Sequence, residues 1–225
     1  MLIIAMPKSA STSLLDTLGK LHNIPADQVY FNKYIPPSNC KYIFKLHSDI
    51  RELTMTQVDQ FDSQDSIFKQ HIFPSNNNLE LFQKSKKVVL LRNPYDVVAS
   101  YHRTEKFFFQ ETNNDDFKTD KTIEEWIDRA EKLGIIDDLK KYSLWTQQKN
   151  TLTITYDELM KSPKNAINKI EVFFNLNVTT TKIELEKKRY TRLNKIGKIK
   201  NYIRYRIIYP LYSILFDAFA WSTKK

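Results

Sequence analysis

The segment LIIAMPKSASTSLLDTLGKL, residues 2–21, passes from an apolar stretch through a polar turn into a second apolar pattern. Its opening residues, Leu2–Ala5, have the length and composition of a buried β-strand. After the turn, leucines recur on one helix face at Leu14, Leu15, Leu18 and Leu21. Ser11 or Thr12 stands where the N-cap of that helix is expected. The segment therefore predicts a strand, a loop and a helix in direct succession.

Further segments are short, apolar and rich in β-branched or aromatic residues: Lys41–Lys45, Ser66–Lys69, Val88–Leu91 and Thr151–Thr155. Such runs are typical of strands covered on both faces of a parallel sheet. Helical patterns separate several of them. One begins with a capping box at Thr122 and Glu125, and another opens at Pro163. The sequence therefore predicts an α/β fold, an open and mostly parallel sheet of about five strands with helices on both faces.

The composition favours one basic domain. The chain has 225 residues, 41% of them hydrophobic, which suffices for one sizeable core, so we expect a single domain over residues 1–225. Its formal charge of +9 is concentrated in a basic, aromatic C-terminal segment, residues 182–225. Between Lys182 and Arg206, ten Lys or Arg residues stand against two Glu residues. This charge indicates an anionic partner, such as a nucleotide, nucleic acid, acidic glycan or membrane surface, unless it is a solvated helix face.

Cys40 is the single cysteine, which excludes an intramolecular disulfide. The first apolar run, Leu2–Ala5, is too short for a signal peptide. The last apolar stretch, Ile207–Trp221, is interrupted by a proline and an aspartate and is shorter than the roughly 20 residues of a membrane span. We therefore expect a soluble, cytoplasmic protein.

The turn after the first strand, Pro7–Ser13, has the features of an anion-binding loop. Amides and the positive dipole end at the start of a helix attract phosphate or sulfate. Lys8 adds a point charge, and hydroxyl groups come from Ser9, Ser11, Thr12 and Ser13. The two-glycine pattern of an ATPase P-loop is missing from this turn. The alternative is an ordinary serine-rich N-cap.

A second candidate anion site follows the segment Val88–Leu91. Arg92 stands at the carboxyl end of this predicted strand, and a helix is expected to start near Pro94. Ser100 lies eight positions after Arg92. The planar guanidinium can donate two parallel hydrogen bonds to a phosphate, and Ser100 can add a third. The alternative is a helix start with an exposed arginine.

His71 follows the predicted strand Ser66–Lys69 and is the candidate general base. A hydroxyl is a poor nucleophile at neutral pH, so a positioned imidazole that removes its proton is useful. Lys69 precedes His71 in a Lys-x-His pattern, which His47 shares with Lys45. A structural role is the alternative for either histidine.

The turn Pro7–Thr12 resembles the 5′-phosphosulfate loop of sulfotransferases that use 3′-phosphoadenosine 5′-phosphosulfate (PAPS), which have a P-loop NTPase-like fold. Arg92 with Ser100 resembles the 3′-phosphate site of that family. His71 lies 21 residues before Arg92, which matches the family's Lys-x-His. His47 lies 45 residues before Arg92, too far for the same match. We therefore rank His47 below His71.

The resemblance implies roles for particular residues. Cofactor contacts are implied for Lys8, Ser9, Ala10, Ser11, Thr12, Ser13, Arg92, Ser100 and Tyr156. Catalytic roles are implied for His71 as general base and for Lys8, Lys69 and Ser100. Two positions depart from the family pattern: Ala10 replaces a glycine, so its backbone should avoid positive φ, and Ser13 replaces an adenine-stacking tryptophan. Lys195 and Lys198 match the family's late phosphate contacts only loosely.

The resemblance thus implies a transferase that moves a sulfuryl group from PAPS to a hydroxyl or amine without a metal. Small molecules, lipids and glycans all stay open as acceptors, as do peripheral membrane contact through the C-terminal segment and the oligomeric state, and no nucleic acid partner is expected. Two alternatives stand. One is a kinase-like, nucleotide-dependent enzyme on a related fold, with magnesium and carboxylates near Lys8. The other is a non-catalytic basic protein that binds through Lys182–Arg206.

Overall fold

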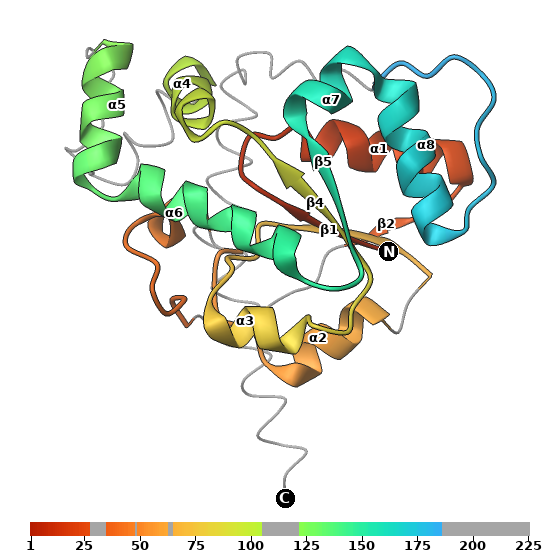
Figure 1. Cartoon of the computed structure of the whole chain (residues 1–225), viewed down its shortest axis with the longest axis horizontal. Coiled ribbons are helices and arrows are strands. Elements are labelled where there is room, and N and C mark those ends of the chain that lie inside the picture. The colour runs from red at the N-terminus through yellow and green to blue at the C-terminus, as the bar shows by residue number, and fades with distance from the viewer. Residues whose placement is uncertain (28–34, 48, 63–64, 105–121, 186–225) are drawn as a thin grey trace, which may run out of the picture. The chain divides into compact units, whose positions relative to one another are not determined.

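The computed structural model describes residues 1–27, 35–47, 49–62, 65–104 and 122–185. All of these belong to one compact unit. Its five strands form a single sheet in the order β2-β3-β1-β4-β5, and every neighbouring pair is parallel (Figure 1). The strands are β1 (Leu2–Ala5), β2 (Ala26–Asp27), β3 (Ile67–Gln70), β4 (Lys87–Leu91) and β5 (Thr151–Thr155). The predicted open, parallel α/β fold is confirmed.

Helices connect these strands and lie on both faces of the sheet. They are α1 (Ser11–His22), η1 (Ile43–Lys45), α2 (Met55–Asp62), α3 (Asn76–Leu81), α4 (Pro94–Thr104), α5 (Ile123–Lys132), α6 (Ile135–Lys141), η2 (Tyr142–Gln147), α7 (Tyr156–Lys161) and α8 (Pro163–Phe174), where η marks a 3₁₀ helix. The predicted capping box at Thr122 and Glu125 is confirmed, as is the helix start at Pro163. In Figure 1, α2 and α3 lie below the strands, whereas α1 and α8 lie to their upper right.

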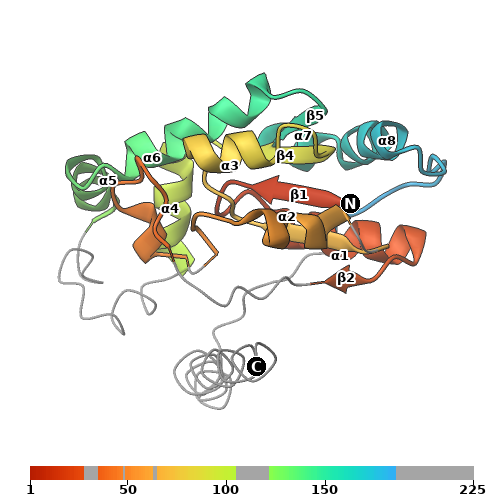
Figure 2. The same cartoon turned by 90° about the horizontal axis from the view of Figure 1, so that it is seen from below.

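Alternation along the strands divides the core into two faces. Ile3 and Ile67 belong to an aliphatic cluster that includes the buried apolar residues of α1 and α8. The next residue of β3, Phe68, instead packs edge-on against Phe61 of α2, with ring centroids 5.3 Å apart. Because successive strand residues point to opposite faces, α1 and α8 cover one side of the sheet and α2 covers the other. Figure 2 shows the same layers in a view turned by 90°.

The predicted strand Lys41–Lys45 is wrong. This segment enters η1, whose 3₁₀ hydrogen bonds include Lys45 N to Tyr42 O at 2.9 Å. The buried carboxylate of Asp138 accepts the backbone N–H groups of Lys41, Tyr42 and Ile43, so these donors do not serve a sheet. The fifth strand is instead the two-residue β2, which pairs with β3 at the edge.

The start of α1 also differs from the prediction. Ala10 adopts a positive φ of 63° and is itself the N-cap of α1, without a side-chain capping bond. The expectations that Ala10 would avoid positive φ and that Ser11 or Thr12 would cap the helix are therefore wrong. Lys8 also has a positive φ, 59°, so two bends turn the chain from β1 into α1. A left-handed conformation costs a residue with a Cβ atom about 1–2 kcal/mol, so the loop stores strain.

The C-terminal basic segment lies almost wholly outside the described residues, which end at residue 185. Lys195 and Lys198 are among the residues outside the description. The single-domain expectation for residues 1–225 stays a prediction. In the part of the chain that the structure describes, no helix has the length and apolar character to cross a membrane.

Replacing Ala10 with glycine relieves the strained conformation and should raise the free energy of unfolding by about 1 kcal/mol. Ala99→Gly is the matched control, because Ala99 lies inside α4 with helical geometry and its loss should lower the free energy of unfolding by about 1 kcal/mol. Urea denaturation of both variants measures the difference. Equal destabilisation by the two changes would contradict the strain at Ala10.

Candidate active site

Predicted site residues converge at the carboxyl edge of the sheet. The loop that contains Lys8 leaves β1, His71 follows β3, Arg92 follows β4 and Tyr156 follows β5. Because all of these strands are parallel, their carboxyl ends meet at one edge. This is the edge at which open α/β sheets bind ligands.

The loop after β1 is tied directly to Arg92. Nη1 of Arg92 donates a 2.6 Å hydrogen bond to the carbonyl oxygen of Lys8. Within the loop, the buried hydroxyl of Ser9 donates to the carbonyl of Met6 at 2.6 Å, and the amide of Met6 donates to Leu90 of β4 at 2.9 Å. The loop and the strand that carries the arginine are therefore one connected unit.

Arg92 has capacity left for an anion. Its guanidinium carbon lies 3.9 Å from the centroid of the Tyr156 ring, which is a close cation–π contact. Within the described residues, Nε of Arg92 is the buried side-chain nitrogen that finds no hydrogen-bond partner. An unpaired buried donor costs about 1–3 kcal/mol, and a phosphate oxygen would satisfy it. This orphaned donor fits a phosphate-bearing ligand.

The start of α1 offers a second anion-binding feature. Leu14 is the residue whose amide makes the first helical bond, to Ala10 O at 3.1 Å. The preceding amides of the first turn have no partner within the helix, and Ala10 has no side chain that could cap them. The side chains of Thr12 and Ser13 stay partly exposed there, whereas Ser11 is buried. A helix start of this form favours sulfate or phosphate.

His71 is buried and held in one tautomer. Its Nδ1 lies 2.6 Å from the carbonyl oxygen of Ala5, at the end of β1. A carbonyl only accepts, so Nδ1 carries the proton and Nε2 of the neutral ring keeps its lone pair. Burial, reinforced by the charges of Lys69 and Lys8, lowers the pKa of His71 to about 4. At neutral pH the imidazole is therefore an unprotonated base.

A second histidine packs against the first. The rings of His47 and His71 meet edge to face, with centroids 4.9 Å apart. Nε2 of His47 is hydrogen-bonded to the hydroxyl of Tyr101 in α4, and Nζ of Lys8 lies 5.0 Å from the centroid of the Tyr101 ring. The structure thus brings both Lys-x-His histidines to the same site, and ranking them as competitors overlooked this pairing.

Asp49 is a site residue that sequence reasoning missed. Its Oδ2 accepts the backbone N–H of His71 at 2.9 Å. Burial alone would raise the pKa of Asp49, but the facing rings of His71 and His47, with the ammonium of Lys69, lower it to about 2. The available signal was its position two residues after His47. Tyr101 was also missed, although it follows Ser100 directly.

Ser100 and Lys69 are placed close to this network. Ser100 lies on α4 beside Tyr101 and is half-buried. Lys69 is half-buried on β3 and acts on His71 through its charge. Their implied catalytic and phosphate-binding roles stay predictions. Among the described residues, no cluster of three or more His, Cys, Asp or Glu side chains could hold a metal ion.

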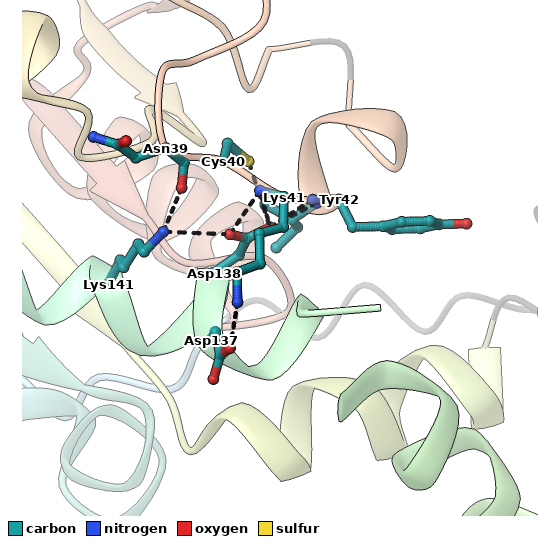
Figure 3. Close-up of polar contacts among 8 residues, drawn as sticks. Asn39, Cys40, Lys41, Tyr42, Asp137, Asp138 and Lys141 are labelled. Atoms are coloured by element: carbon teal, nitrogen blue, oxygen red, sulfur yellow. Dashed lines mark hydrogen bonds and ion pairs between the residues drawn. The ribbon is translucent and has the colours of Figure 1, made fainter. Parts of the chain in front are cut away.

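Asp138 of α6 anchors the segment that leads to His47 and Asp49. Its fully buried carboxylate accepts the amides of Lys41 at 2.9 Å and Tyr42 at 2.7 Å (Figure 3). Cys40 lies within 3.5 Å of the same carboxylate, and burial together with this negative charge raises the pKa of its thiol to about 12. Cys40 is therefore an inert structural thiol.

Asp138→Ala should lower the free energy of unfolding by about 3 kcal/mol, because several buried N–H donors lose their acceptor. The neighbouring Asp137 provides the matched control. Its 2.8 Å ion pair with Lys41 is exposed on both sides, so Asp137→Ala should change the free energy of unfolding by less than about 0.5 kcal/mol. Urea denaturation tests the pair. A similar small effect from both substitutions would show that Asp138 does not anchor the segment.

Comparison with known proteins agrees with this fold. The sulfotransferase domain family matches residues 1–206. Mouse sulfotransferase SULT7A1, crystallised with PAP, is similar in structure, with a TM-score of 0.51 and 16% identity over 80% of this chain. The chain spans only 59% of the length of that mouse enzyme. No curated protein matches the chain in sequence.

Other solved structures show weaker similarity. A sulfotransferase from Alicyclobacillus acidocaldarius has a TM-score of 0.45 and 12% identity, with 88% of each chain covered. A sulfotransferase domain from the curacin biosynthetic pathway has a TM-score of 0.47 and 16% identity, covering 80% of this chain and 74% of that domain.

The protein is thus an open α/β protein with a candidate anion-binding loop at the carboxyl edge of its sheet. It belongs to the sulfotransferase domain family.

Proposed function

We propose that the protein transfers a sulfuryl group from PAPS to an acceptor hydroxyl or amine, with His71 as the general base. The observation that carries this proposal is the hydrogen bond from Arg92 to the Lys8 carbonyl, which joins the two candidate anion sites. PAPS carries negative groups at both ends of its ribose, and a single connected pair of anion sites suits such a ligand. The PAP-bound mouse structure supports the same choice of nucleotide.

Different residues bind the two ends of PAPS. Bound PAPS supplies an activated sulfuryl group, whose bond to the 5′-phosphate breaks as the bond to the acceptor forms. Lys8 and the amides at the start of α1 hold the 5′ end and offset the charge left on the departing phosphate. Arg92 and Ser100 hold the 3′-phosphate, and the unpaired Nε of Arg92 gains an acceptor there. Tyr156 keeps the guanidinium plane in place.

His71 removes the acceptor's proton. Its Nδ1–H bond to the Ala5 carbonyl fixes the ring and leaves Nε2 as the proton acceptor. The lowered pKa keeps this nitrogen unprotonated at neutral pH, at the expense of base strength. Lys69, which lies on β3 two residues before His71, stabilises the negative oxygens of the sulfuryl group.

The acceptor is a small molecule, a lipid or a glycan bearing a hydroxyl or amine. The basic C-terminal segment favours an anionic acceptor or peripheral contact with an anionic membrane, and we assign it no nucleic acid partner. Function in the cytoplasm fits a nucleotide co-substrate. These assignments concern the whole protein and extend the family assignment.

Incubation with ³⁵S-labelled PAPS and a mixed panel of hydroxyl and amine acceptors tests the function. Lys8→Ala and His71→Ala should each lower turnover about 100-fold, because one preorganised group at a transition state is worth about 3 kcal/mol. Lys132→Ala, on the exposed part of α5, is the lysine control and should keep full turnover. Urea denaturation verifies that each variant is folded, and His71→Gln replaces His71→Ala if the smaller side chain unfolds the protein. Near-wild-type turnover in Lys8→Ala or His71→Gln would defeat the assignment.

The pH dependence of kcat/KM for PAPS should lack the usual histidine limb near pH 6.5. Because the pKa of His71 is lowered to about 4, the base is lost only when the pH falls toward that value. The same shift means that the folded state resists protonation, so stability also declines as the pH falls from about 6.5 to 4. Circular dichroism at each pH separates unfolding from titration. A decline centred near pH 6.5 in folded protein would contradict a buried, neutral His71.

A further inference from the structure

The segment that follows η1 places the carboxylate of Asp49 against the backbone of His71. Oδ2 of Asp49 accepts the backbone N–H of His71 at 2.9 Å, across 22 residues of chain. This hydrogen bond holds the backbone of His71 just after the end of β3. It therefore also fixes the point from which the imidazole side chain extends. The carboxylate is half-buried, and its lowered pKa of about 2 keeps it charged at every pH at which the protein would work.

The surroundings of His71 are otherwise basic or neutral. Lys69 precedes it on β3 and Lys8 lies in the loop after β1, and both charges oppose an imidazolium. His47 packs edge-on against the ring, and the hydroxyl of Tyr142 in η2 donates to the His71 carbonyl at 3.1 Å. Of the charged groups that act on His71 in the described part of the chain, Asp49 supplies the favourable charge.

We propose that Asp49 is the positioning residue of the general base: it holds His71 through the backbone and supplies the counter-charge for the imidazolium that forms when the acceptor is deprotonated. This inference rests on the proposed function. In that step the acceptor's proton moves to Nε2, an electron pair of its oxygen or nitrogen forms the new bond to sulfur, and the bond from sulfur to the 5′-phosphate oxygen breaks, so that adenosine 3′,5′-bisphosphate leaves with the electron pair of that bond. The imidazolium later releases the proton to water.

The need for Asp49 follows from the two lysines. They suit the negative sulfuryl oxygens, but the same charges disfavour a positive charge on His71. The carboxylate of Asp49, which is bonded to the His71 backbone, has the opposite effect on the ring. Asp49 thereby lets a site built for anions use a base that becomes a cation.

The Asp49→Asn substitution separates the effect of the side chain's charge from the effect of its shape. Asp49→Asn keeps an oxygen that can accept the His71 N–H but removes the negative charge, whereas Asp49→Ala removes both. If Asp49 were only structural, Asp49→Asn would behave as wild type and Asp49→Ala would lose stability. If Asp49 supplies the counter-charge, Asp49→Asn alone is sufficient to weaken the base. Asp137→Asn, on the exposed surface of α6, is the matched control.

The direct readout is the His71 imidazole, followed by nuclear magnetic resonance in ¹⁵N-histidine-labelled full-length protein without ligand. Asp49→Asn should lower the pKa of His71 by about one unit, and Asp137→Asn should leave it unchanged. With PAPS, Asp49→Asn should lower kcat about tenfold. Calorimetry should find its affinity for adenosine 3′,5′-bisphosphate within about twofold of wild type, because Asp49 is bonded to the backbone of His71 and not to Lys8 or Arg92.

The outcomes distinguish this inference from the proposed function. An unchanged or raised pKa of His71 in Asp49→Asn overturns the role of Asp49, even if the wild-type protein transfers sulfuryl groups. A lowered pKa in a protein that transfers none supports the coupling of Asp49 to His71 and refutes the proposed function. A loss of nucleotide affinity equal to the loss of kcat in Asp49→Asn would also overturn the role, because it would show general damage to the site.

Discussion

The hydrogen bond from the Arg92 guanidinium to the carbonyl oxygen of Lys8 is the constraint on which the site depends. It closes the loop after β1 against the end of β4, two strands that are neighbours in the sheet. A cation–π contact links the guanidinium to Tyr156, which follows a third strand, β5. The candidate anion-binding groups are therefore positioned by the parallel sheet itself, and the first turn of α1 adds amides that have no partner within the helix.

Local sequence was sufficient for the parts of the fold whose determinants lie close together in the chain. β1, the loop after it and α1 follow one another within about 20 residues, and the apolar runs of β4 and β5 identify themselves without long-range information. The prediction of a strand at Lys41–Lys45 failed because the structure of this segment is decided by Asp138, almost 100 residues away. The prediction that Ala10 avoids a positive φ failed for another reason. The fold imposes a positive φ at this position, although the preference of alanine alone opposes it.

The residues of the candidate site also fall into two groups, those that the sequence predicts and those that it does not. Motif spacing located Lys8, His71 and Arg92 as a set, because each stands at the end of a strand and parallel strands bring those ends together. Asp49 and Tyr101 could not be found in this way, since one acts through a backbone amide and the other through a ring contact. Both depend on how segments between the strands fold back over the carboxyl edge.

The central claim is that the two anion sites hold one nucleotide with phosphates at both its 3′ and 5′ positions. Titration of the full-length protein with adenosine 3′,5′-bisphosphate by calorimetry tests it most directly, with adenosine 5′-monophosphate as the comparison ligand. The account predicts saturable binding of one bisphosphate per chain, with much weaker binding of the monophosphate. Absence of binding, or equal affinity for both nucleotides, would contradict it.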